Sequence, residues 1–258
     1  MGVENENSAY GTFWEHLEEF RGCLLRIIAV TCAISIILFC IKDLLFDIIL
    51  APTSSDFITF KLIGAEKFRI KLINTGLTEQ FSTHIKTALS CGLLLSSPYI
   101  LFEIFRYISP ALYSNERKLA TRLTFTTYLM FSIGILINYF ILFPLTVKFL
   151  GTYQVSDDIN NMLTISSYID TLINMSLVIG IIFELPVVCW MLASFGILKA
   201  EWMKKFRRHS IVAILVLSAI ITPTTDMFTL IVVSLPIWLL YELSVVIVSK
   251  TNKSRQNV

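Results

Sequence analysis

Long apolar runs separated by short polar stretches make up most of the chain after its first two dozen residues. A bilayer core of about 30 Å needs roughly 20 apolar residues in a helix, and six segments reach or approach that length. They are residues 24–41, 85–108, 123–143, 169–193, 210–221 and 228–248. The pattern predicts an all-α polytopic membrane protein with six transmembrane helices.

The fifth segment is the shortest of the six. Arg207, Arg208 and His209 precede it and Pro223 follows it, so it cannot be extended at either end without including polar residues or proline. A helix shorter than the hydrocarbon core must thin the bilayer, tilt little or lie inside the protein. We expect the fifth and sixth helices to be short.

The positions of Lys and Arg predict the orientation. Six spans place both termini on one side, and by the positive-inside rule this side is the cytoplasm. It would carry Arg21, Arg26, Arg106, Arg117, Lys118, Arg122, Lys199, Lys204, Lys205, Arg207, Arg208, Lys250, Lys253 and Arg255. Only the loop at residues 42–80, with Lys61, Lys67, Arg69 and Lys71, runs against the rule. We expect one membrane domain over residues 1–258: a cytoplasmic amphipathic segment (1–23), six helices (24–248) and a cytoplasmic tail (249–258).

Composition excludes several function classes. With 55% hydrophobic residues, 16% charged residues and a mean hydropathy of +0.72, the chain is too apolar for a soluble domain. No GxxxxGK[ST], HExxH or GxSxG motif is present, and the five cysteines form no CxxC pair. We therefore expect no enzyme, cofactor, metal site or nucleic-acid partner.

The segment before the first span is amphipathic. Apolar residues recur in it at helical spacing, so it is expected to lie along the cytoplasmic interface before turning into the span. Acids are unfavourable beside an anionic leaflet, which indicates that they face protein or a cationic ligand. Alternatively, they form a solvated face with Glu15 and Glu19 as an i, i+4 pair. The apolar positions are Phe13, Leu17, Phe20 and Leu24, and the charged ones are Glu15, Glu18, Glu19 and Arg21.

A second charged cluster follows the second apolar run. There the sequence passes through a proline turn at Pro110 and reaches Glu116 and Arg117 where a membrane would end. A carboxylate at such a boundary needs water or a cationic partner. That partner could be a substrate.

Glu184 is flanked by uncharged residues for more than a helical turn on both sides. An ionisable residue inside a span is a functional candidate, and Pro186 should interrupt the helix beside it. The alternative is a protonated glutamate with a purely structural hydrogen bond. Glu103 and Glu242 lie nearer span ends and are expected to reach water.

An ordered set of motifs at the span boundaries resembles one family, the TatC proteins of twin-arginine translocases, with a bacterial and Bacteroidetes-like character. The resemblance covers residues 13–248. The matching motifs are His16-Leu17-Glu18-Glu19-Phe20-Arg21, Ala51-Pro52, Ser97-Pro98, Ser109-Pro110-Ala111-Leu112-Tyr113, Asn115-Glu116-Arg117, Phe143-Pro144, Phe183-Glu184-Leu185-Pro186, Thr222-Pro223, Asp226, Leu235-Pro236 and Tyr241-Glu242.

This resemblance implies a multi-pass receptor of the cell inner membrane. It would bind twin-arginine signal peptides and assemble with single-span TatA/TatB-type subunits and further copies of itself, amid membrane lipid, to export folded precursors with the proton-motive force. The implied signal-peptide residues are Glu19, Glu116, Tyr107, Arg21 and Arg117. The implied partner contacts are Glu184, Thr222 and Asp226, and the structural prolines are Pro52, Pro98, Pro110 and Pro186.

The chemistry of arginine fits this reading. A guanidinium offers a fork of donors that a carboxylate accepts and an ammonium cannot copy, so two interfacial carboxylates can distinguish Arg-Arg from Lys-Lys. One departure concerns Leu230, which stands where many family members carry a partner-facing Gln. The polar docking cluster then keeps Thr222, with Thr229 as a second candidate.

Two other functions stay open on the sequence alone. A secondary transporter could use Glu184 and Glu103 as ion sites, although the chain shows no matching halves with interrupted spans. A passive membrane scaffold could use its acids only for assembly.

Overall fold

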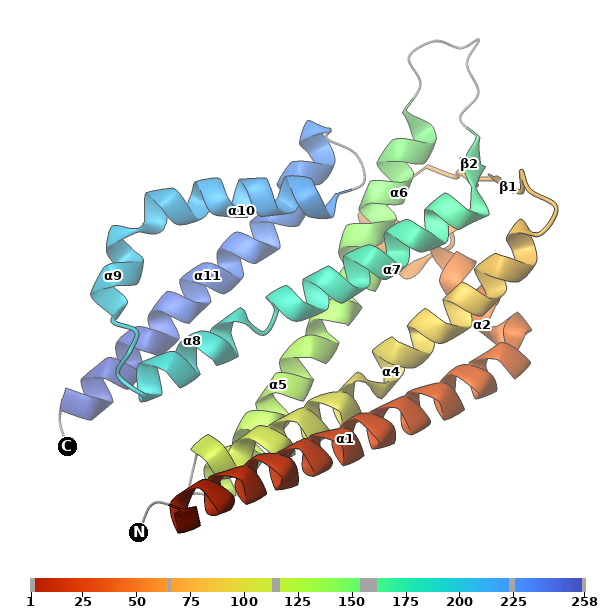
Figure 1. Ribbon diagram of the computed structural model, residues 1–258. Coiled ribbons are helices and arrows are strands. Elements are labelled where there is room, and N and C mark those ends of the chain that lie inside the picture. The colour runs from red at the N-terminus through yellow and green to blue at the C-terminus, as the bar shows by residue number, and fades with distance from the viewer. Residues whose placement is uncertain (1–2, 65, 113–116, 154–161, 223–225, 257–258) are drawn as a thin grey trace. The chain divides into compact units, whose positions relative to one another are not determined.

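Helices form most of the backbone in the computed structural model, which describes residues 3–64, 66–112, 117–153, 162–222 and 226–256 (Figure 1). Two short strands, β1 and β2, pair in parallel with Leu72 opposite Leu163. The prediction of a mostly helical chain is confirmed. The elements in chain order are α1 (Val3–Cys40), α2 (Lys42–Leu50), the 3₁₀ turn η1 (Ala51–Thr53), α3 (Ile58–Ile63), β1 (Leu72–Ile73), α4 (Glu79–Leu112), α5 (Arg117–Ile137), the π-helical turn η2 (Asn138–Leu142), α6 (Phe143–Thr152), β2 (Leu163–Thr164), α7 (Ile165–Ile182), α8 (Leu185–Ser194), α9 (Ala200–Lys205), α10 (Arg207–Ile221) and α11 (Met227–Gln256).

Five stretches of the described chain are helical, long and apolar enough to cross a membrane. They are Leu17–Cys40, Glu79–Ile104, Thr124–Thr152, Ile165–Ser194 and Met227–Lys253. The remaining predicted span, residues 210–221, falls in α10, which has 15 residues. At 1.5 Å per residue α10 is about 22 Å long, shorter than a bilayer core. The sixth crossing therefore stays a prediction.

Two predicted helix boundaries are wrong. The last helix, α11, has 30 residues instead of being short, because it passes Pro236 without ending and continues through the polar tail to Gln256. At the other end, α1 runs from Val3 to Cys40 without the expected turn before the first span. No proline interrupts this stretch, so the backbone ladder continues from the polar segment into the apolar one.

The described prolines have different local roles. Pro52 lies in η1 and is buried, whereas α4 continues through both Pro98 and Pro110 to its end at Leu112. Pro186 lies in the first turn of α8, after a break that separates this helix from α7. The predicted interruption beside Glu184 is confirmed, because a proline is tolerated where the first amides of a helix have no partner.

The chain divides into two compact units, residues 1–41 with 88–128 and residues 42–87 with 129–258. The single membrane domain expected over residues 1–258 stays a prediction. In the first unit α1 lies along α4 (Figure 1). Thr31 and Ser96 share a hydrogen bond of 2.9 Å between their hydroxyl oxygens, and a Cβ on Gly92 would lie 2.0 Å from the Ser35 hydroxyl oxygen.

The order of these contacts fixes the direction of the two helices in the first unit. Moving along α1 from Phe20 through Thr31 to Ser35 corresponds to moving backwards along α4, from Tyr107 through Ser96 to Gly92. The helices are therefore antiparallel, and the middle of α1 lies beside the last turns of α4.

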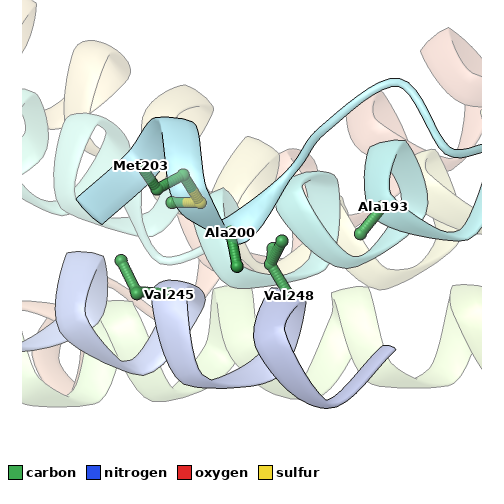
Figure 2. Packing of buried hydrophobic residues seen from close by; sticks show 5 residues of the cluster. All are labelled: Ala193, Ala200, Met203, Val245 and Val248. Carbon is green, nitrogen blue, oxygen red and sulfur yellow. The ribbon is translucent and has the colours of Figure 1, made fainter. Parts of the chain in front are cut away.

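In the second unit, α8 and α9 pack against α11. Figure 2 shows Ala200 and Met203 of α9 facing Val245 and Val248 of α11, with Ala193 of α8 beside them. Polar contacts also join α9 to α11 and α10 to α11. The Tyr241 hydroxyl donates to the carbonyl oxygen of Met203 at 2.7 Å, and Nη2 of Arg207 lies 2.6 Å from Oε2 of Glu242.

Candidate functional site

A cavity of about 720 Å³ in the first unit is lined by the middle of α1 and the last turns of α4. Helical spacing explains the lining, because residues three, four and seven positions apart share one face. The cavity holds three carboxylates and two guanidinium groups, a formal charge of −1. Its side chains are Glu18, Glu19, Cys23 and Arg26 from α1 and Glu103, Arg106 and Tyr107 from α4.

Glu103 lies at the centre of a hydrogen-bonded network. Nε and Nη2 of Arg26 donate to its Oε2 at 3.2 and 2.9 Å, and the hydroxyl of Tyr99 donates to its Oε1 at 3.1 Å. Nη1 of Arg106 lies 3.7 Å from Oε1. These contacts place positive charge and donors around both carboxylate oxygens.

The burial of Glu103 corrects the expectation that it reaches water. Its side chain is 3% exposed, whereas that of Arg26 is 49% exposed. A carboxylate is retained in such a position only when it is paired and hydrogen-bonded. Arg26 meets that condition from the neighbouring helix. Glu242 is 27% exposed and paired with Arg207.

Two of the predicted signal-peptide residues line this cavity together. Glu19 is exposed on α1, and Tyr107 lies half-buried on α4 with its ring 5.5 Å from that of Phe20. Arg21 is exposed and is not among the side chains described as lining the cavity.

The other two predicted residues cannot be placed beside them. Glu116 lies outside the described residues. Arg117 is the first residue of α5, and its side chain is outside the described part of the chain. The expected approach of Glu19 and Glu116 therefore stays a prediction.

Sequence reasoning missed Arg26 and Glu103 as members of this site. A helical signal for them exists, since Glu19, Cys23 and Arg26 recur at i, i+4 and i+7, and Glu103 and Tyr107 at i and i+4. What the sequence does not display is the pairing itself, which joins residues 77 positions apart.

Glu184 lies in the break between α7 and α8, in the second unit. Its carbonyl oxygen accepts from the amides of Val187 and Val188, each at 3.0 Å, and so starts the next helix. Its side chain is partly exposed. The break thus places a carboxyl group beside two apolar helices. A contact with a polar group of another helix would require a carboxyl group in such a position.

Thr222 and Asp226 have local structural partners. The buried hydroxyl of Thr222 donates to the carbonyl oxygen of Ser218 at 3.0 Å. Oδ1 of Asp226 accepts from the amide of Thr229 at 2.8 Å, and the Thr229 hydroxyl contacts its other carboxylate oxygen. Asp226 thereby caps the start of α11. Leu230, in the next position along this helix, is half-buried.

The chain is similar over nearly its whole length to proteins of one kind. Residues 15–236 match the family model of the Sec-independent protein translocase protein, TatC. The protein of this name from Blattabacterium is 32% identical and aligns over 94% of this chain and 97% of its own length. That from Desulforapulum autotrophicum is 34% identical over 95% and 86%, respectively. A crystal structure of the twin arginine translocase receptor TatC matches with a TM-score of 0.74 at 32% identity, covering 92% of this chain and 99% of that one.

Proposed function

Because this chain belongs to the TatC family of Sec-independent protein translocase proteins, we propose that it is the signal-peptide receptor and core subunit of a twin-arginine translocase. Like the family, it is a multi-pass protein of the inner membrane and a component of a protein transport system. In the proposed role it binds the Arg-Arg motif of folded precursors. It assembles with single-span TatA/TatB-type subunits, and the proton-motive force drives export.

The acidic cavity formed by residues 18–26 of α1 and the last turns of α4 is the observation that carries this proposal. Glu19 offers an exposed carboxylate there, and Tyr107 offers an aromatic face. Glu116 follows the last residue of α4 by four positions in the sequence. In the proposed orientation, with both termini in the cytoplasm, this end of the two helices faces the compartment in which precursors are made.

The interaction between a carboxylate of this chain and a guanidinium of the signal peptide sets the expected affinity for the peptide. A carboxylate and a guanidinium about 4 Å apart attract by about 4 kcal/mol at an effective dielectric constant near 20. Desolvation and the ordering of the peptide offset much of this gain. Glu19 is exposed, so its interaction is weakened further by solvent. We therefore expect modest affinity from each pair, and recognition from the two pairs acting together.

Glu184 is the proposed contact for a partner helix within the membrane. The partly exposed side chain of Glu184, at a break in an apolar helix pair, can exchange hydrogen bonds with a polar side chain of a single-span subunit. The apolar segment of the signal peptide would lie along the spans. Thr222 and Asp226 contribute chiefly through the backbone geometry at the end of α10 and the start of α11, respectively.

Crosslinking of a signal peptide to charge variants tests the receptor role. Glu116→Lys and Glu19→Gln should each lose crosslinking to an Arg-Arg peptide while inserting normally into the membrane. Glu242→Gln, which alters a glutamate of the second unit, serves as the matched control and should crosslink like the parent. Undiminished crosslinking of the Glu19 and Glu116 variants would favour a scaffold or a carrier instead.

A carrier role is disfavoured by the state of Glu103. Its carboxylate is held by Arg26 and Tyr99, so it does not resemble an ion site awaiting a proton. Proteoliposomes containing this chain alone should show no specific uptake of small solutes, and saturable uptake abolished by Glu184→Gln would support the carrier.

A further inference from the structure

The guanidinium group of Arg26 binds Glu103, the buried acid of the cavity. An Arg-Arg peptide would bring the same chemical group. Two N–H groups of Arg26 bind one oxygen of Glu103, at 3.2 and 2.9 Å. The cavity also contains the exposed acid Glu19, on the same face of α1. An intramolecular guanidinium therefore already occupies the most buried carboxylate of a site proposed to bind guanidinium groups.

We propose that Glu103 is a further guanidinium-binding carboxylate of this cavity and that Arg26 occupies it as an internal substitute for ligand. When an Arg-Arg peptide binds, one of its arginines takes the place of Arg26 on Glu103, and the side chain of Arg26 moves into water. The inference rests on the proposed receptor function and names a residue pair that determines its specificity.

Burial decides which partner moves. The side chain of Glu103 is 3% exposed and is also held by Tyr99, so its carboxylate stays in place. Arg26 is 49% exposed, and a long charged side chain at a helix surface can turn its head group outward while its stem remains packed. The outward move needs no change of the α1 backbone.

Replacement of Arg26 by an arginine of the peptide avoids the main free-energy cost of breaking the Arg26–Glu103 ion pair. Removing one partner of a buried ion pair leaves an uncompensated charge, which is strongly unfavourable. If another guanidinium arrives as Arg26 leaves, Glu103 is paired in both states. Arg106 also remains close, with Nη1 3.7 Å from Oε1, and limits the loss during the exchange.

The exchange also gives a reason for preferring arginine to lysine. A ligand must displace a group that makes two hydrogen bonds to one oxygen, and an ammonium is a point charge without the planar fork that achieves this. Because Arg26 competes for Glu103, the apparent affinity of any ligand is its intrinsic affinity multiplied by the fraction of molecules in which Glu103 is available. Only a ligand with an equivalent donor set overcomes that competition.

Arg26→Lys tests the competition without changing the charge of the cavity. The weaker internal competitor should make the full-length protein in lipid nanodiscs bind an Arg-Arg signal peptide about three- to tenfold more tightly. Arg207→Lys is the matched control, because Arg207 likewise pairs with a glutamate but lies in the second unit, outside the cavity, and this variant should bind the peptide as tightly as the parent. Equal or weaker binding by Arg26→Lys would overturn the inference.

A measurement on the unaltered protein does not depend on any variant folding. Phenylglyoxal modifies accessible guanidinium groups, and the extent at Arg26 can be read by mass spectrometry, with the exposed Arg208 of the second unit as the reference. Saturating Arg-Arg peptide should raise modification of Arg26 at least about twofold, as the side chain leaves Glu103. A Lys-Lys peptide should not. Unchanged or lower modification with the Arg-Arg peptide would contradict the exchange.

The results separate this inference from the receptor proposal. Failure of the unaltered protein to bind any Arg-Arg peptide would overturn both. Peptide binding with normal dependence on Glu19, but with no gain from Arg26→Lys and no change in Arg26 modification, would overturn the exchange alone and leave Arg26 as a structural clamp between α1 and α4.

Discussion

Tyr107 of α4 packs against Phe20 of α1, with ring centroids 5.5 Å apart and ring planes inclined by 50°. Phe20 is the residue after Glu19, so this contact brings an aromatic side chain near the end of α4 next to an acid in the middle of α1. Both rings belong to the first unit, and Tyr107 also lines the acidic cavity.

The ring of Tyr107 should matter more than its hydroxyl. Tyr107→Phe keeps the aromatic contact and should crosslink to a signal peptide nearly as well as the parent. Tyr107→Ala removes a pair interaction worth about 0.5–1.5 kcal/mol beyond the buried area, and should lower the crosslinking yield several-fold. Comparable yields from the two variants would show that the ring does not organise the site.

Close helix contact in the second unit should make Gly180 intolerant of a side chain. A Cβ at this position would lie 2.8 Å from Cε2 of Phe131. Gly180→Ala should therefore destabilise the protein by about 1–3 kcal/mol through overpacking, measured as thermal unfolding in detergent. Gly22→Ala is the control, because its nearest neighbour, Nη1 of Arg26, would be 3.5 Å away. An unchanged melting temperature for Gly180→Ala would contradict the described packing.

Asp226 should act mainly through the start of α11. Its Oδ1 accepts from the amide of Thr229 at 2.8 Å, and loss of such a cap costs about 0.5–2 kcal/mol. Asp226→Ala should lower stability by that amount, whereas Asp226→Asn retains an acceptor and should unfold like the parent. If Asp226→Asn were stable yet failed to copurify with a single-span partner, the carboxylate itself would be the docking group.

Sequence patterns located the apolar helices well and their ends less well. Hydropathy reports where lipid contact stops, whereas a helix ends where its backbone hydrogen bonds stop. Thus α1 begins far ahead of the first apolar run, and α11 continues to Gln256 through a polar tail. The break before Pro186 was predictable, because proline acts on the backbone of its own neighbourhood.

The acidic cavity was predictable only in part. Glu19 belongs to a motif that carries the family resemblance, and that resemblance implied Tyr107; the structure places both on the cavity wall. The burial of Glu103 was not predictable, because it depends on an ion pair with Arg26, which lies in another helix 77 positions away. Nearness to a span end suggests access to water, but a paired carboxylate can remain inside at the same depth.

Photo-crosslinking from positions 19 and 116 to a signal peptide tests the receptor role most directly. A photoreactive residue is placed at each position in turn and should capture a signal peptide with an Arg-Arg motif. A Lys-Lys version of the same peptide should be captured much less well from both positions. Equal yields for the two peptides, or capture from one position without the other, would contradict recognition by a pair of carboxylates.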